Sequence, residues 1–163
     1  MKWKPQAVIL SSTLFVLIGI AVTVATGLWQ TESDKVPRKL QAEVVTAESP
    51  TQYDPADIRG SYTFGEVSEL FNIPLDALTV AFGIPQSNAE GFQVKSLESL
   101  YPNAEAEIGT ASVRLFVAWY LQVPYEPAET TYLPATASDA LRSVGALSQT
   151  QLDYLTRHTV SLP

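Results

Sequence analysis

The chain contains no cysteine, and this absence excludes several classes of function. Without thiols there are no disulfides, thiolate metal sites or cysteine-ligated iron–sulfur clusters, and no lipidation through cysteine. Histidine is almost as scarce, since His158 is the only one in the sequence. We therefore expect any redox role of this chain to be indirect.

Signatures of common catalytic and metal sites are also missing. The sequence has no phosphate-binding glycine loop, no calcium loop and no histidine-containing metal spacing. Ser112 lacks the G-x-S-x-G frame, and Glu105 and Glu107 precede a predicted helix, where carboxylates commonly meet the helix dipole. His158 falls in the last turn of a predicted helix, so we expect a helix-end cation or a solvated side chain rather than a base. We predict no enzyme activity and no cofactor.

Cations are few in the part of the chain that follows Asp54. Residues 55–163 contain twelve Asp and Glu against five Lys and Arg, which matches the net charge of −7 for the whole chain. Binding to nucleic acid relies on clustered cations that neutralise phosphates. We therefore expect no nucleic acid partner.

One long uncharged run is present near the N-terminus. Residues 7–29 comprise 23 residues without a charge, and a helix rising about 1.5 Å per residue would cross a hydrocarbon core of about 30 Å. Trp3 and Trp29 bracket this run as interfacial tryptophans do, and the lysines within residues 1–6 favour a cytoplasmic N-terminus. We predict a single-pass anchor in the lipid bilayer of the cell membrane, with the C-terminal domain extracytoplasmic.

A cleaved signal peptide is the alternative interpretation of the same run. Residues 23–25, Thr-Val-Ala, offer a small-residue cleavage site. The run is longer than the roughly 7–15 residues of a signal h-region, which favours an uncleaved anchor. In both cases the rest of the chain is exported.

Residues 30–54 differ in composition from the segments on either side. They carry charges of both signs with scattered Ser, Thr, Pro and Gln, which is typical of a linker. A flexible chain of this length has a root-mean-square reach of roughly 25–30 Å. A short helix over residues 35–46 is the alternative, although short isolated helices are marginal in water.

Residues 63–85 carry start and stop signals for two short helices. Thr63 and Glu66 form a capping box, and Pro74 ends the first helix because the residue before a proline disfavours the α conformation. Gly83 suits a left-handed C-terminal cap, and Pro85 blocks continuation of the second helix. The stretch therefore predicts a helix-turn-helix shape.

Further helices are predicted along the rest of residues 55–163. They cover residues 96–101, 110–122 and 138–144, followed by a helix that opens at a capping box formed by Ser148 and Gln151. The helix over residues 110–122 is the most apolar, so we expect it to be the most buried. The fold class is then all-α, with about five or six short helices in the globular domain.

Aromatic residues near loops are the most suggestive surface feature. Tyr101, Trp119, Tyr125 and Tyr132 are candidates for an interaction surface, since amphipathic rings are enriched in interfaces. The three prolines within residues 123–134 predict an extended connection there. The alternative is that the rings cover a small helical core while their polar tips stay in water.

The helix-turn-helix shape also raises the possibility of DNA binding. The second helix, residues 74–82, would be the recognition element, yet it offers Asp76 and Thr79 and no Arg, Lys, Asn or Gln. Shape without cations gives little support to this interpretation.

Several positions within residues 57–101 resemble a known module. They are Ile58, Gly60, Thr63, Phe64, Glu66, Val67, Ile73, Pro74, Leu78, Phe82, Gly83, Ile84, Pro85, Val94 and Leu97. The pattern is similar to a small helical module of bacterial membrane proteins, some of which occur alongside ferredoxin-type or b-type cytochrome membrane subunits. The resemblance implies an accessory module in or beside a membrane electron-transfer assembly. This chain has no cysteine motif and no histidine pair in its predicted membrane helix, so it would not carry the cofactors itself.

The sequence thus favours a membrane-anchored, non-enzymatic interaction or accessory subunit that docks on a membrane protein or complex. Two alternatives remain open. One is an exported enzyme or small-ligand-binding domain without a recognisable motif. The other is an anchored helix-turn-helix DNA-binding regulator, which requires a cytoplasmic domain.

Overall fold

The computed structural model describes residues 36–40, 53–101 and 106–161. The predicted anchor, residues 7–29 with Trp3 and Trp29, and most of the predicted linker lie outside the described residues. The described ranges belong to one compact unit, Val36–Pro163. Among them, none of the helices has the length and apolar character that crossing a bilayer requires.

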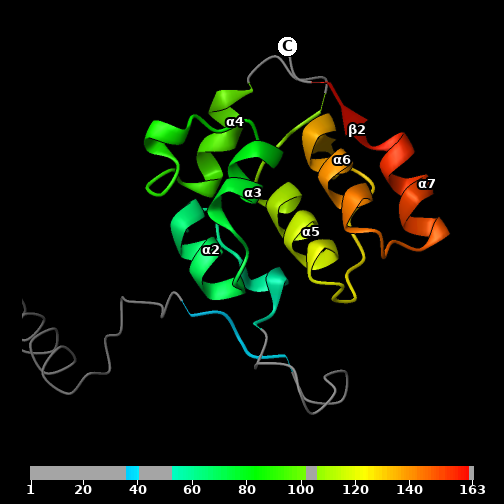
Figure 1. Ribbon diagram of the computed structural model, residues 1–163, viewed down its shortest axis with the longest axis horizontal. Coiled ribbons are helices and arrows are strands. Elements are labelled where there is room, and N and C mark those ends of the chain that lie inside the picture. The colour runs from blue at the N-terminus through cyan, green and yellow to red at the C-terminus, as the bar shows by residue number, and fades with distance from the viewer. Residues whose placement is uncertain (1–35, 41–52, 102–105, 162–163) are drawn as a thin grey trace, which may run out of the picture. The chain divides into compact units, whose positions relative to one another are not determined.

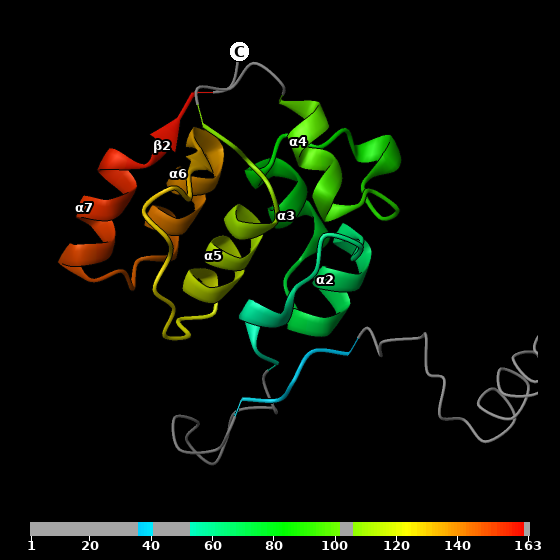
Figure 2. The same cartoon turned by 180° about the vertical axis from the view of Figure 1, so that it is seen from behind.

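Helices dominate the described part of the chain, which confirms the all-α prediction for it. They are α2 Phe64–Phe71, α3 Leu75–Ala81, α4 Leu97–Leu100, α5 Thr110–Tyr120, α6 Ala135–Val144 and α7 Gln149–Arg157. Short 3-10 turns, η1 Pro55–Asp57, η2 Gln86–Asn88 and η3 Val94–Ser96, connect some of them. Helix α5 lies in the middle, with α2, α3 and α4 on one side and α6 and α7 on the other (Figure 1; Figure 2 from behind).

Local signals in the sequence set the helix starts. In α2 the Glu66 N–H donates to Thr63 Oγ1 at 3.1 Å, and the Thr63 N–H donates to Glu66 Oε2 at 2.8 Å. In α7 the equivalent distances between Ser148 and Gln151 are 3.3 and 2.8 Å. Both predicted capping boxes are therefore confirmed, and each satisfies backbone donors that the first turn leaves free.

The end of α3 follows the predicted glycine cap. Gly83 adopts a left-handed conformation with φ of 60°, which costs glycine little. The Ile84 N–H donates to Thr79 O at 2.9 Å and the Gly83 N–H donates to Val80 O at 3.3 Å, the pattern of a Schellman motif. Helix α2 ends before Pro74, as predicted, and Asn72 adopts the left-handed conformation directly after its last residue, Phe71.

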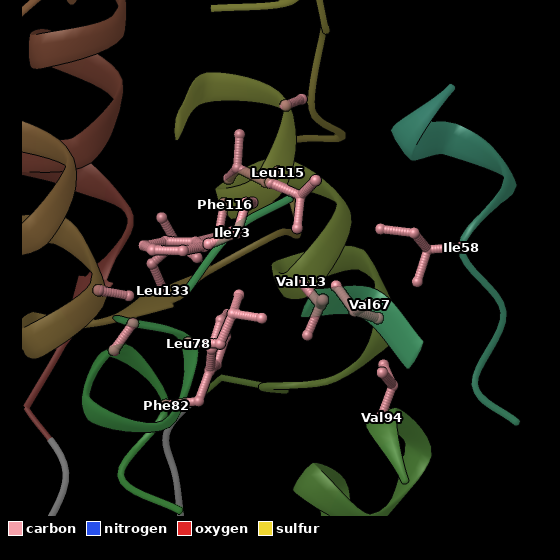
Figure 3. Close-up of a cluster of buried hydrophobic side chains, with 14 of the residues drawn as sticks. Ile58, Val67, Ile73, Leu78, Phe82, Val94, Val113, Leu115, Phe116 and Leu133 are labelled. Atoms are coloured by element: carbon pink, nitrogen blue, oxygen red, sulfur yellow. The ribbon is translucent and has the colours of Figure 1, made fainter. Parts of the chain in front are cut away.

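The core is centred on α5, as its apolar sequence predicted. Phe116 is 0% exposed, and its ring meets that of Phe82 edge-on with centroids 5.5 Å apart. Phe82 in turn meets Phe64 of α2 at 5.7 Å. The close-up in Figure 3 shows side chains of α2, α3 and α5 converging with Leu133 from the later part of the chain. One continuous core therefore joins both sides of the domain.

Two short strands were not predicted. Strand β1, Leu133–Pro134, pairs in parallel with β2, Thr159–Val160, and the strands flank the α6 and α7 pair in sequence. The hydroxyls of Ser138 and Thr159 lie 2.6 Å apart beside this pairing. The segment just before α6 and the segment just after α7 are therefore joined by backbone pairing, although they are far apart in the sequence.

Part of the predicted linker belongs to the folded unit. Residues 36–40 contain no helix, and Lys39 forms an isolated antiparallel bridge with Tyr53. The Tyr53 ring meets Phe71 edge-on at a centroid distance of 6.4 Å, which ties this bridge to α2. The folded unit therefore includes residues that the sequence predicted as linker.

Candidate functional site

The four aromatic residues predicted as an interaction surface do not share one environment. Trp119 is only 3% exposed, so the prediction that it belongs to an exposed interaction surface is wrong. Its indole N–H donates to Tyr125 O at 3.2 Å, and its ring meets Tyr154 edge-on at 5.5 Å. Trp119 is buried because residues 123–134 and α7 cover that side of α5, and no local signal in the sequence reveals such cover.

The three tyrosines are half-buried and pack against the core. The Tyr101 hydroxyl donates to Phe82 O at 2.6 Å. Burial raises the pKa of Tyr101 and also that of Tyr125 above the ordinary value. The alternative interpretation, in which rings cover the core, therefore describes these side chains well, and only their remaining exposed edges are open to a partner.

A stacked pair on α7, Tyr154 and His158, is the feature that sequence reasoning missed. The two rings are nearly parallel, with an interplanar angle of 5° and centroids 3.9 Å apart. The centroid of the His158 ring also lies 5.1 Å from that of the Tyr132 ring. The signal in the sequence was their i, i+4 spacing, which places the two side chains on the same helix face.

This pair holds the backbone of a surface loop, residues 126–132. The Tyr154 hydroxyl lies 2.9 Å from Ala128 O and 2.7 Å from Thr131 O, and can donate to either. His158 Nε2 lies 3.0 Å from Glu129 O. Within the loop the Thr131 N–H donates to Ala128 O at 2.9 Å. Three backbone carbonyls of one turn, those of Ala128, Glu129 and Thr131, are thus contacted by buried side chains.

His158 itself differs from expectation. Its backbone caps the C-terminus of α7, but its side chain is buried at 5% exposure, so the prediction of a solvated side chain is wrong. Nδ1 faces Tyr154 O and Nε2 faces Glu129 O, each at 3.0 Å. Whichever nitrogen carries the proton donates to a backbone carbonyl. The side chain therefore positions the loop.

The outer face of the loop carries negative charge. Glu126 and Glu129 are exposed, and the Glu129 carboxylate lies 3.6 Å from His158 Nε2. Pro124 and Pro127 restrict the backbone on the way into the loop. The result is a backbone of fixed shape that presents carboxylates to solvent.

A cavity of about 340 Å³ lies between this loop and the start of α5. It is lined by Ala106, Glu107, Gly109, Ala111, Glu129, Thr130, Thr131 and Tyr132. Across residues 36–40, 53–101 and 106–161, no cluster of histidine and carboxylate side chains is arranged to hold a metal ion. Its lining therefore includes two acidic residues, two threonines and one tyrosine.

The Tyr154 phenol provides a test of this arrangement at alkaline pH. Its burial, with the nearby charge of Glu129, raises its pKa to about 12. The unfolded value is near 10. The folded state favours the neutral phenol, so its contribution to stability is complete below pH 10 and is lost as the pH rises towards 12.

We expect an absorbance titration of tyrosinate to show a last step near pH 12. This step disappears in Tyr154→Phe and remains in the control Tyr101→Phe. If Tyr154→Phe leaves the last step unchanged, the last step does not belong to a buried Tyr154 phenol.

Comparison with family models, with curated proteins and with solved structures finds no match. The resemblance of residues 57–101 to a membrane-associated module therefore stays a prediction. The function has to be argued from the geometry of the chain itself.

Proposed function

We propose that the chain is a membrane-anchored, non-enzymatic accessory subunit whose extracytoplasmic domain docks on a membrane protein assembly through residues 123–134. The observation that carries this proposal is that the buried side chains of Tyr154 and His158 contact the backbone of the loop at residues 126–132 and fix its shape. The uncharged run of residues 7–29 supports the anchor.

A fixed loop suits docking because association costs conformational freedom. Ordering a backbone residue costs about 1–2 kcal/mol, and a loop already held in the free protein avoids much of that loss. Buried hydrogen bonds from Tyr154 and His158 supply this order before any partner arrives. Such loops on rigid scaffolds are common sites of recognition.

The charge of the loop indicates the kind of partner. Glu126 and Glu129 are exposed on it, and Glu107 lines the neighbouring cavity. Complementary potentials speed encounter and suppress wrong partners more than they raise affinity. We therefore propose a partner surface rich in Lys and Arg next to the bilayer.

The anchor would favour docking by raising the effective concentration of the domain near its partner. A domain tethered to the same membrane as its partner meets it at a high effective concentration, so modest contacts suffice. That the partner belongs to an electron-transfer complex comes from the resemblance of residues 57–101 alone and is proposed on that basis.

The cavity favours one alternative, an exported small-ligand-binding domain. Its volume of about 340 Å³ falls at the lower end of the roughly 300–1,000 Å³ typical of ligand pockets. A small molecule that raises Tm for the parent but not for Glu107→Gln would support it. The DNA-binding alternative gains nothing, because Thr79 of α3 is buried and the exposed Asp76 would repel phosphate.

The test is purification of the tagged full-length protein from its native membrane in mild detergent, followed by mass spectrometry. We expect stoichiometric membrane subunits with the parent and at least about a tenfold loss of them with Glu126→Lys, about 1.4 kcal/mol of binding. The matched control is Glu69→Lys, which makes the same charge change at an exposed position of α2. A lone protein from the parent, or equal losses in both variants, would contradict the proposal.

A further inference from the structure

Residues 36–40 are attached to the domain by hydrogen bonds from backbone and side chain. The Asp54 N–H donates to Arg38 O at 2.7 Å, and the Arg38 N–H donates to Asp57 Oδ2 at 2.9 Å. Lys39 bridges to Tyr53, and Pro37 is buried. The chain on the anchor side of the domain is therefore tied back onto it.

The side chains in this attachment meet in a fork between Arg38 and Asp57. Arg38 Nε donates to Oδ2 at 2.9 Å and Nη2 donates to Oδ1 at 3.0 Å, the bidentate geometry that guanidinium and carboxylate favour. These hydrogen bonds lower the pKa of the Asp57 carboxyl to about 2. Asp57 belongs to η1, which packs against α5, so the acceptor is fixed on the core of the domain.

We propose that residues 36–40 are a releasable clasp, held by Arg38 and Asp57, that shortens the chain between the predicted membrane anchor and the domain. With the clasp attached, six residues, 30–35, separate the predicted anchor from the domain and span at most about 20 Å. With it detached, 25 residues, 30–54, span at most about 85 Å. The effect on how far the domain reaches from the membrane depends on the anchor of the proposed function. The existence of the clasp does not depend on it.

Several properties of the clasp make it releasable. The Arg38 side chain is 81% exposed, so dissolved ions screen its attraction to Asp57. The clasp buries little apolar surface, since Pro37 is its one buried residue and Val36 faces solvent. Asp54 adds a second negative charge near Arg38, and both carboxylates lie on the domain side. Loss of one charge should therefore free the segment while the helices stay folded.

The absence of cysteine makes the test direct. In Lys39→Cys/Tyr53→Cys the only two thiols lie on a bridged antiparallel pair, whose Cα atoms are typically about 4.5–5.5 Å apart and within disulfide range. Mild oxidation of this full-length protein in a whole-cell lysate, before membranes are separated, should cross-link most molecules rapidly. We expect Asp57→Asn and Arg38→Gln each to slow the cross-link several-fold. The matched control Asp139→Asn, at an exposed position of α6, should leave the rate unchanged.

Equal rates in the parent pair and in both clasp variants would overturn the proposal, as would no cross-link in the parent pair. Circular dichroism checks that Asp57→Asn is folded. Arg38→Gln alters a residue that lies outside the helices. Together, the two variants distinguish release of residues 36–40 from unfolding of the domain. Flotation of the same protein with membranes tests the anchor independently. Cross-linking without flotation would reject the anchor and with it the role in reach, while the clasp itself would stand.

Discussion

Phe116→Ala is expected to lower the free energy of unfolding of the domain by about 3–5 kcal/mol. Phe116 is fully buried in α5, and its ring contacts Phe82 and Tyr120 at centroid distances of 5.5 and 5.6 Å. Truncation removes apolar contacts and leaves a cavity that packed neighbours fill only in part. Since domains of this size are stable by about 5–15 kcal/mol, this one change removes a large share of the total.

Urea unfolding followed by circular dichroism measures this effect. The control is Val80→Ala on α3, because Val80 is 61% exposed and should change stability by less than about 0.5 kcal/mol. If the two substitutions cost the same, α5 is not the centre of the core. A loss below about 1 kcal/mol for Phe116→Ala would lead to the same conclusion.

His158→Ala is expected to cost about 2–4 kcal/mol and to release the loop at residues 126–132. The substitution removes the ring stacked on Tyr154 and leaves Glu129 O without its partner. Tyr154 O is less affected, since it still accepts from the His158 backbone N–H at 2.9 Å. The loss should therefore fall mainly on the loop.

Two further variants separate stacking from hydrogen bonding. His158→Phe keeps an aromatic ring but no donor, so its cost should be smaller, about 1–3 kcal/mol. Cleavage by a Glu-specific protease after Glu129 reports loop order, and it should accelerate in both variants. Thr150→Ala, at an exposed position in the first turn of α7, is the control and should change neither property. Unchanged cleavage in His158→Ala would show that the loop keeps its shape without the histidine.

Features set by neighbouring residues were predictable from the sequence. The capping boxes at Thr63 and Ser148 and the glycine cap at Gly83 are local arrangements of the chain, and each appears as predicted. Helix α5 was recognisable because a wide apolar stripe has to be buried. The number and type of the helices in the described part of the chain follow from such signals.

Features set by distant residues were not predictable. Trp119 and His158 are buried because loop residues 123–134 return across α5 and α7, a path that no local pattern specifies. The pairing of β1 with β2 and the fork from Arg38 to Asp57 likewise join residues far apart in the sequence. Composition alone marked residues 30–54 as linker, since a short polar segment carries no sign of where it binds.

The extended connection over residues 123–134 was predictable from the sequence, but the contacts that hold it were not. The sequence pointed to residues 123–134 through their prolines and tyrosines. The structure adds that Tyr154 and His158 fix the loop and that its exposed groups are carboxylates rather than rings. The expected contact to a partner therefore shifts from aromatic anchors to charge presented on a fixed backbone.

Site-specific photo-cross-linking in intact cells tests the central claim most directly. A photoreactive residue placed at position 126 should give a discrete cross-link to a membrane protein, whereas the same residue at position 69 on α2 should give none. Cross-links of equal strength from both positions, or none from position 126, would contradict docking through this loop.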